Sequence, residues 1–410
     1  MNRRMNRNRL NIGAYILKPY ARSEQHIRDV AASGVDFIVC MENDRPALDL
    51  FEKYGVGAIV TGVLPAWWGG DGANAGKLAE TNPMEKYVEA AKTFADHPAV
   101  WGIDIGDEPS ALDFPYYGQV MDKVNELFPN QFAYLNLYPN YASVAVNNAS
   151  QTVNQLGTAT YDEHIAKYCE YIPADYICYD FYLYSCNVTK HYENLCTVAD
   201  ACLNTGRGMW IVLQVNSLYP EKWITENQLR FQAYTSMAFG AENIIWACYT
   251  AGWWSNQVVD ENGEKTQQYA KMQKINAELR TLSEDYMHYR RVATHFVGFA
   301  GHPDMAAVKQ DAIESLNTGI FLDVKAEDGM PLVVGQMTSR HADGANALMI
   351  CAADDPQDES PKTSRIVFRV AGGRNVTAMN GCGKKPVVRL ADGSYAVEIA
   401  SNEGVLIQAK

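Results

Sequence analysis

HPAVWGIDIGDEP, residues 97–109, is the stretch of this chain that constrains its fold most strongly. It begins with an apolar run and ends in Asp107, Glu108 and Pro109. Side chains on a strand alternate between its two faces, so Asp104 and Glu108 should share one face while Ile103 turns to the other. Pro109 has no backbone N–H and should end the strand. The segment therefore predicts a buried strand that presents Glu108 at its carboxyl end.

Short β-rich apolar runs alternate with amphipathic helical stretches on both sides of this segment, from about residue 11 to residue 289. Such alternation is expected when each parallel strand is returned by a crossover helix. The predicted strands are Ile12–Tyr20, Val35–Glu42, Val56–Leu64, Val100–Gly106, Phe132–Tyr138, Tyr176–Tyr184, Met209–Val215 and Asn243–Thr250. The helices predicted between them include Ser23–Ser33, Met84–Asp96, Tyr117–Leu127, Tyr161–Tyr171 and Gln228–Phe239. Eight rounds predict a (β/α)₈ TIM barrel.

An open, doubly wound sheet would also alternate strands and helices. That fold places a Gly-rich phosphate loop after its first strand, whereas this chain has Lys18, Pro19 and Tyr20 there. The closed barrel is therefore the favoured α/β architecture.

The pattern changes from about Phe296 to short alternating runs separated by Gly, Asp, Asn and Pro. Runs of this kind are typical of a small antiparallel β-sandwich. The predicted strands are Gly319–Val324, Pro331–Thr338, Ala347–Ala352, Arg365–Val370, Ser394–Ile399 and Gly404–Gln408. We therefore expect a barrel domain at residues 1–292 and a C-terminal β-sandwich domain at residues 293–410.

The composition excludes several classes of partner and cofactor. A formal net charge of −13 disfavours nucleic acid, whose binding requires clustered Lys and Arg. No apolar run approaches the roughly 20 residues of a membrane span, so no membrane partner is expected. The eight His form no HxxxH or HxH cluster, the nine Cys show no CxxC spacing, and no nucleotide fingerprint is present. We expect no metal and no cofactor.

The cellular location is constrained only by the N-terminus and the cysteines. The first ten residues are rich in Arg and Asn, and no apolar signal segment follows them. The odd number of cysteines suggests no disulfide framework. The chain is expected to be cytoplasmic, or secreted or periplasmic with its signal peptide outside this sequence.

Polar and aromatic residues gather at the carboxyl ends of the predicted strands. In a parallel barrel these ends meet at one rim, where TIM-barrel active sites lie. The expected rim residues are Glu42, Trp67, Trp68, Asp107, Glu108, Asn136, Tyr138, Asp180, Tyr182, Gln214, Trp253 and Trp254. We therefore expect a binding site for a small polar molecule at this rim.

The residue types at this rim suit carbohydrate chemistry. Hydrolysis of an acetal needs a proton for the leaving oxygen, and a carboxylic acid among aromatic neighbours can supply it near neutral pH. Glu108 is the candidate acid. The tryptophan pairs offer flat rings that stack on sugar faces. Hydrogen bonds to sugar hydroxyls are expected from Asn136, Tyr138, Tyr182, Gln214 and Glu42. Glu42 is also an alternative candidate for the second carboxylate.

The segment His97–Pro109 and the later runs YLNLYPNY (residues 134–141) and YDFY (residues 179–182) resemble barrel glycoside hydrolases of clan A and their β-galactosidase-like relatives. The resemblance covers the barrel and extends loosely to the β domain. It implies a carbohydrate substrate and Glu108 as general acid/base, with Asp107 in place of the Asn that usually precedes this Glu. It also implies a nucleophilic Glu after strand seven, but Gln214 stands there.

Three hypotheses accommodate the missing strand-seven Glu. In the first, Asp180 after strand six is the second catalytic carboxylate. In the second, Asp107 and Glu108 act as an adjacent pair, as in N-acetylhexosaminidases whose substrate acetamido group attacks the sugar carbon. In the third, the barrel binds carbohydrate without cleaving it.

Overall fold

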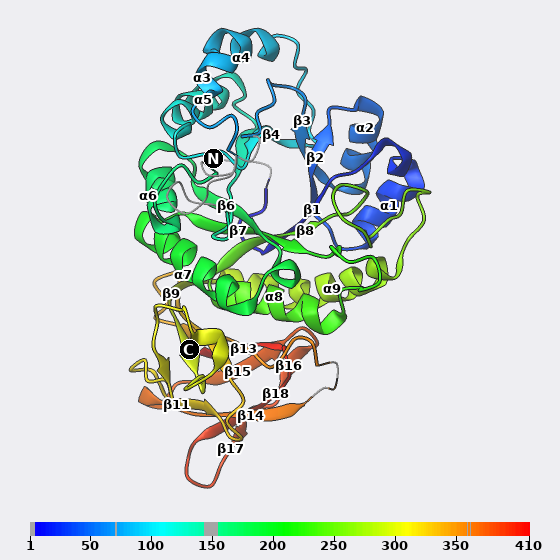
Figure 1. Cartoon of the computed structure of the whole chain (residues 1–410). Coiled ribbons are helices and arrows are strands. Elements are labelled where there is room, and N and C mark those ends of the chain that lie inside the picture. Colours follow the sequence, from blue (N-terminus) through cyan, green and yellow to red (C-terminus); the bar gives the residue numbers. More distant parts are fainter. Residues whose placement is uncertain (1–4, 70–71, 143–154, 359, 361) are drawn as a thin grey trace.

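The computed structural model describes residues 5–69, 72–142, 155–358, 360 and 362–410, and their first part is a closed parallel barrel (Figure 1). Its strands are β1 (Asn11–Tyr15), β2 (Phe37–Glu42), β3 (Gly57–Thr61), β4 (Val100–Asp107), β5 (Phe132–Asn136), β6 (Tyr176–Phe181), β7 (Gly208–Gln214) and β8 (Ala241–Ala247). Parallel pairing runs from β5 through β1 and β8 to β6. The ring closes where the Leu137 N–H donates to the Cys178 carbonyl at 2.9 Å. The predicted TIM barrel is confirmed.

Helices in the seven crossover connections, and α9 after the last strand, surround the barrel (Figure 1). They are α1 (Glu24–Ala32), α2 (Arg45–Tyr54), α3 (Leu78–Thr81) with α4 (Met84–Ala91), α5 (Phe114–Leu127), α6 (Tyr161–Tyr171), α7 (Val188–Thr205), α8 (Glu226–Ala238) and α9 (Gln267–Met287). Local chemistry sets several ends. Thr225 and Gln228 form a capping box at the start of α8, and Gly206 ends α7 in the left-handed conformation. The first predicted strand was too long at its end, because Ile16 has a φ of 67° and leaves the strand conformation.

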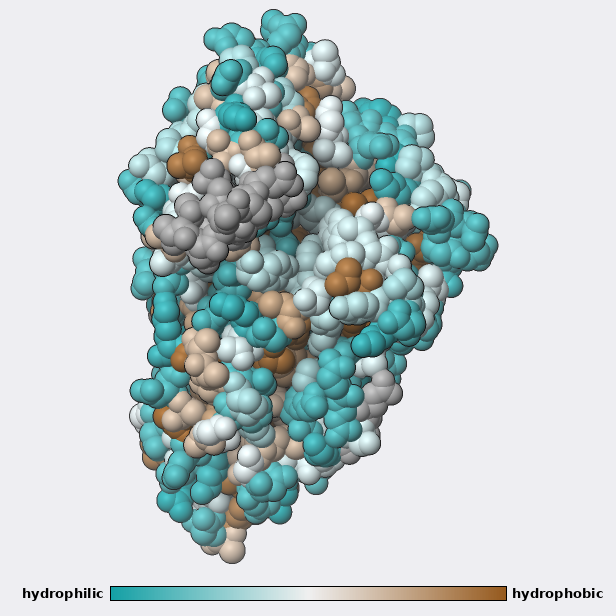
Figure 2. All heavy atoms as spheres, viewed as in Figure 1, coloured by the Kyte–Doolittle hydropathy of each residue, from teal (hydrophilic) through white to brown (hydrophobic). Residues whose placement is uncertain are grey.

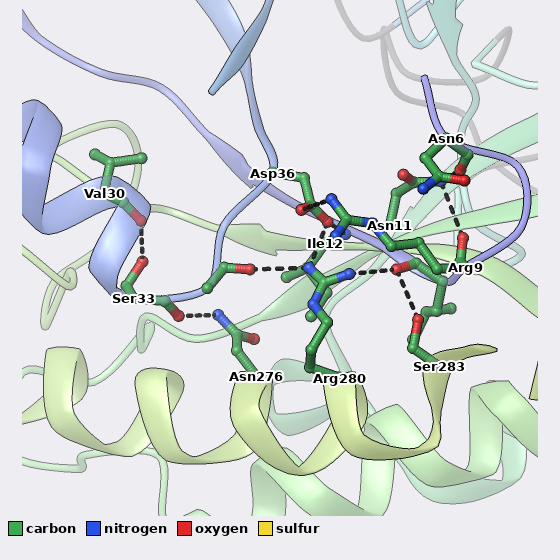
Figure 3. A network of polar contacts seen from close by, with 12 residues as sticks. Asn6, Arg9, Asn11, Ile12, Val30, Ser33, Asp36, Asn276, Arg280 and Ser283 are labelled. Carbon is green, nitrogen blue, oxygen red and sulfur yellow. Dashed lines mark hydrogen bonds and ion pairs between the residues drawn. The ribbon is translucent and has the colours of Figure 1, made fainter. Parts of the chain in front are cut away.

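A polar network fastens the last helix to the first strands (Figure 3). Asp36 is 7% exposed and accepts hydrogen bonds from Arg9 at 2.7 Å, Arg280 at 2.6 Å and the Ile12 N–H at 2.9 Å. Arg280 also donates to the Leu10 carbonyl at 3.1 Å. Because Arg280 lies on α9 and its partners precede β1 and β2, this network holds together the beginning and the end of the barrel sequence.

The rest of the chain forms two antiparallel sheets that enclose a second apolar core. The seven-stranded sheet contains β10 (Ala312–Ile313), β9 (Tyr289–Val297), β12 (Leu332–Ser339), β13 (Asn346–Ala352), β19 (Gly404–Ala409), β15 (Val376–Asn380) and β16 (Gly383–Lys385). The four-stranded sheet contains β11 (Phe321–Ala326), β14 (Thr363–Val370), β18 (Tyr395–Ala400) and β17 (Val388–Arg389). The predicted C-terminal β-sandwich is confirmed.

The large sheet packs directly on the barrel through α8 and α9 (Figure 1). The approach is close at Gly335 in β12, where a Cβ atom would lie only 2.9 Å from the carbonyl carbon of Ala238. Buried side chains of the sheet such as Val333, Met349 and Leu406 belong to the same apolar core as the barrel helices. The β domain therefore shares a continuous interior with the barrel. Within the described residues, no helix combines the length and the apolar character that a membrane crossing requires.

Candidate active site

The carboxyl end of β4 departs from regular strand geometry. Its pairing with β5 shifts register between Asp104 and Gly106, which marks a bulge. Glu108 follows with a φ of 45°, while its N–H donates to the Asn136 carbonyl at 2.9 Å. Gly69 lies against this turn, because a Cβ atom there would be 3.2 Å from the Glu108 carbonyl oxygen. The backbone at Glu108 is thus strained and held from two sides, which fixes where its side chain starts.

Three carboxyl groups, the buried Asp180 and the partly buried Asp104 and Asp107, meet at this end of the barrel. The Asn136 side chain links two of them, because its Nδ2 donates to Asp180 at 2.8 Å and to Asp107 at 3.1 Å. Asp104 lies earlier in β4, directly before the bulge, and its carboxyl group accepts from the Gly106 N–H at 3.1 Å. The register shift in β4 lies between these two aspartates, and the charge of Asp107 contributes to the raised pKa of Asp104.

Burial keeps these carboxyl groups partly protonated near neutral pH. It raises the pKa of Asp180 to about 7, and the charge of Asp107 adds to the rise. Burial likewise raises the pKa of Asp107 to about 6 and that of Asp104 to about 7, again with a contribution to Asp104 from Asp107. Carboxylic acids with such pKa values can give and take protons at physiological pH.

Glu108 is joined to this cluster through Asp180. A hydrogen bond from the Glu108 carboxyl favours the ionised form of Asp180 and lowers its pKa, against the effect of burial. Such a bond between two carboxyl groups requires one shared proton. The Glu108 and Asp180 carboxyl groups therefore lie next to each other, where one proton can be shared between them.

Aromatic rings stand around the carboxyl cluster. Tyr182, which follows β6, contacts Trp254 with 5.0 Å between ring centroids and Trp253 with 5.8 Å. Trp253 also meets the Tyr15 ring at 5.6 Å. The surface is hollowed over the middle of the barrel (Figure 2). Rings beside buried carboxyl groups form the kind of lining that pyranose sites use.

The two predicted tryptophans after β3 lie differently. The Trp67 carbonyl accepts from the Asp107 N–H at 3.2 Å, and its indole is buried. Trp68 is 53% exposed and forms a backbone bridge to Asp107. Trp68 thus offers an accessible ring on the segment that runs beside the end of β4, while the Trp67 ring packs in the barrel core.

The remaining predicted residues have other surroundings. Glu42 is exposed and pairs with Arg22 at 2.9 Å. The Gln214 side chain accepts from the Tyr184 N–H at 2.9 Å and is 1% exposed, so it braces the segment after β6. Tyr138 is buried, and its hydroxyl lies 3.8 Å from where a Cβ of Gly69 would be.

The structure adds residues that the strand ends did not single out. Burial raises the pKa of Tyr15, with Asp107 as the next contributor, and burial raises that of Tyr141, with Asp180 and Glu108 contributing. Both tyrosines therefore lie beside the carboxyl cluster. Asp104 belongs to it as well. The sequence indicated the interior position of Asp104, because Asp104 and Glu108 should share one face of the strand. Tyr141 was noted only as part of the run at residues 134–141.

Metal-ligand chemistry finds no support in the part of the chain that the structure describes. No group of three or more His, Cys, Asp or Glu side chains there has an arrangement that could hold a metal ion.

Comparison with known proteins gives matches of structure only. No protein-family model matches the chain, and no curated protein matches its sequence. A catalytic mutant of a GH42 β-galactosidase from G. stearothermophilus is 8% identical, with 98% of both chains covered and a TM-score of 0.58. A glucosidase from Croceicoccus marinus (10% identical, 98% of this chain and 96% of that chain) has a TM-score of 0.45. A β-galactosidase from Marinomonas ef1 is 10% identical, with 66% of this chain and 60% of that chain covered, and has a TM-score of 0.49.

The match to the GH42 β-galactosidase extends over the barrel and the β domain together. The chain therefore shares its fold, a TIM barrel followed by a β domain, with this β-galactosidase, and such a fold is what the resemblance to clan A implied.

Proposed function

We propose that this protein is a glycoside hydrolase that uses Glu108 as its general acid and Asp180 as the second carboxylate. The contact between the Glu108 and Asp180 carboxyl groups, within a cluster of acidic side chains at the carboxyl end of the barrel strands, is the observation that carries the proposal. The glycosidase fold supports it as an analogy, since one barrel fold hosts many reactions.

The reaction follows from the protonation of the pair. Glu108 gives its proton to the glycosidic oxygen as the bond to the sugar carbon breaks, and the leaving group departs as an alcohol. Asp180 then either bonds to the sugar carbon or takes a proton from the attacking water. Water completes the hydrolysis in both cases, and Glu108 recovers a proton.

Substrate binding has to separate the two carboxyl groups. Retaining glycosidases keep them roughly 5–5.5 Å apart and inverting ones about 6.5–9.5 Å, whereas a direct hydrogen bond needs a shorter distance. We infer that the glycosidic oxygen takes the place of Asp180 as the hydrogen-bond partner of Glu108. The shared proton then passes to the substrate.

Glu108→Gln tests the acid. It should lower kcat/KM for unactivated oligosaccharides by at least about 100-fold, since general acids contribute on the order of 10²–10⁴. The loss should be smaller for nitrophenyl glycosides, because their leaving groups need no proton. Stability should stay within about 1 kcal/mol of the parent. Glu170→Gln, on the exposed side of α6, is the matched control and should retain full activity. Unchanged hydrolysis by Glu108→Gln would remove the proposed acid.

Asp180→Asn and Asp107→Asn separate the first two hypotheses. Loss of turnover in Asp180→Asn on all substrates supports Asp180 as the partner. If turnover is lost only in Asp107→Asn, and only with 2-acetamido sugars, the result supports attack by the acetamido group of the substrate. Sugar binding by calorimetry without any product, in the parent protein, would instead identify a carbohydrate-binding barrel.

A further inference from the structure

A cleft of about 720 Å³ lies between the barrel and the β domain, away from the carboxyl cluster. Trp223, Arg230 and Lys271 line it from the barrel, and Cys382 and Glu403 from the β domain. Figure 1 shows this region where α8 and α9 face β15 and β16. Its volume falls in the range of about 300–1,000 Å³ that is usual for small-molecule sites.

A buried hydroxyl without a partner points to a ligand in this cleft. Tyr234, on α8, is fully buried and lines the cleft, and its hydroxyl has no hydrogen-bond partner among the described residues. Two glycines make room for it, because a Cβ at Gly404 would clash with the Tyr234 ring and one at Gly381 would lie 2.9 Å from its hydroxyl. A buried hydroxyl left unpaired costs about 1–3 kcal/mol, so a partner is expected from a bound molecule.

Several charged groups of the cleft have charged partners, and Lys271 donates to the Ile224 carbonyl at 2.9 Å. Arg230 binds Glu278 through two hydrogen bonds of 2.9 and 2.5 Å. Glu226 pairs with Lys274 at 2.6 Å, and Glu403 pairs with Lys385 at 3.4 Å. A charged ligand would have to break these pairs, whereas a neutral polar ligand can bond to the same groups without separating them.

The aromatic side chain adds the apolar part of the lining. The Trp223 indole borders the cleft, with the Lys271 ammonium 6.0 Å from its centre. An indole beside a set of paired polar groups matches a molecule with apolar C–H faces and many hydroxyls. We propose that this cleft is a second, noncatalytic binding site for a neutral oligosaccharide, with Trp223 as the stacking surface and Tyr234 as a hydroxyl partner.

Calorimetry on the full chain tests the site. Glu108→Gln serves as the parent so that sugars stay intact, and the probes are cellotetraose, xylotetraose, mannotetraose and β-1,4-galactotetraose. At least one should bind, with Trp223→Ala weakening the affinity by about tenfold or more and Tyr234→Phe by roughly three- to tenfold. Trp68→Ala, at the barrel mouth, should leave this binding in place. Tyr234→Phe removes only the hydroxyl oxygen and should fold like the parent. Its affinity therefore tests the proposal even if Trp223→Ala does not fold.

Two results would overturn the proposal. One is the absence of binding by all four tetrasaccharides at about 5 mM. The other is an affinity in Tyr234→Phe and Trp223→Ala that equals that of the parent. Neither result depends on hydrolysis, so a protein that cleaves no glycoside can still show the site, and an active enzyme can lack it.

Discussion

Replacing Asp180 with Asn should stop turnover and yet stabilise the folded protein at pH 8. Asp180 is 3% exposed, and burial raises its pKa from 3.8 to about 7. In the unfolded chain the same carboxyl ionises at its ordinary pKa. A difference of about three units corresponds to roughly 4 kcal/mol. Because the folded pKa is the higher one, the folded state loses this free energy as the pH rises from about 4 to about 7.

Asparagine removes the cost of ionisation and keeps most of the contacts. In the wild-type protein the Asn136 side chain donates to Asp180 at 2.8 Å, and the side-chain oxygen of an asparagine at position 180 can still accept this bond. The contact of the Asp180 carboxylate with Glu108 is lost. We take that loss as about 1–2 kcal/mol. The net expectation is a gain of about 2 kcal/mol at pH 8, which corresponds to a rise of roughly 2–4 °C in Tm. The gain should vanish near pH 5, because the cost that remains there, about 1.7 kcal/mol, equals the loss of the hydrogen bond. Below about pH 4 the carboxyl is protonated in both states and Asp180→Asn should be the less stable protein.

Thermal unfolding followed by circular dichroism between pH 5 and pH 8.5 measures the difference. The Tm gap between Asp180→Asn and wild type should widen as the pH rises. Asp122→Asn, on the exposed face of α5, is the control and should show no gap at any pH. A lower Tm for Asp180→Asn at pH 8, with a gap that does not change with pH, would show that Asp180 is not destabilised by its ionisation.

Two further predictions concern the carboxyl cluster and the barrel closure. Asp107→Asn should move the acidic limb of the kcat/KM profile to lower pH, because the Asp107 charge raises the pKa of Asp180; an unmoved limb would contradict Asp180 as the group that must be ionised. Asp36→Ala should lower the free energy of unfolding in urea by about 2–4 kcal/mol, since it leaves the buried Ile12 N–H and two arginines without their acceptor; a loss below about 0.5 kcal/mol would exclude that network as a fastening of the barrel.

The alternation of eight apolar strands with helices was readable from the sequence because periodicity is a local property. Burial of both faces makes barrel strands such as β6 and β8 nearly continuous apolar runs, and crossover helices must separate parallel strands. The change to short alternating runs after Phe296 identified the β-sandwich in the same way. The extent of β1 was less predictable, because the positive φ of Ile16 depends on the loops around it.

Only part of the candidate active site was predictable from the sequence. That Glu108 lies at the end of β4 followed from local sequence, since strand direction and Pro109 determine it. The sequence carried no sign of the bulge between Asp104 and Gly106, of the Asn136 side chain that bridges Asp107 and Asp180, or of the Gln214 side chain that braces the Tyr184 backbone. Each of these depends on neighbours that are remote along the chain.

The sequence by itself determined which elements form, in what order, and which carboxyl group stands at the end of the fourth strand. Only the tertiary structure decided that Asp104, Asp107 and Asp180 gather beside it, and that a polar cleft opens where α8 meets the β domain. The physical reason is range: strand and helix periodicity is encoded over a few neighbouring residues, whereas desolvation and carboxyl pairing depend on side chains brought together from separate strands.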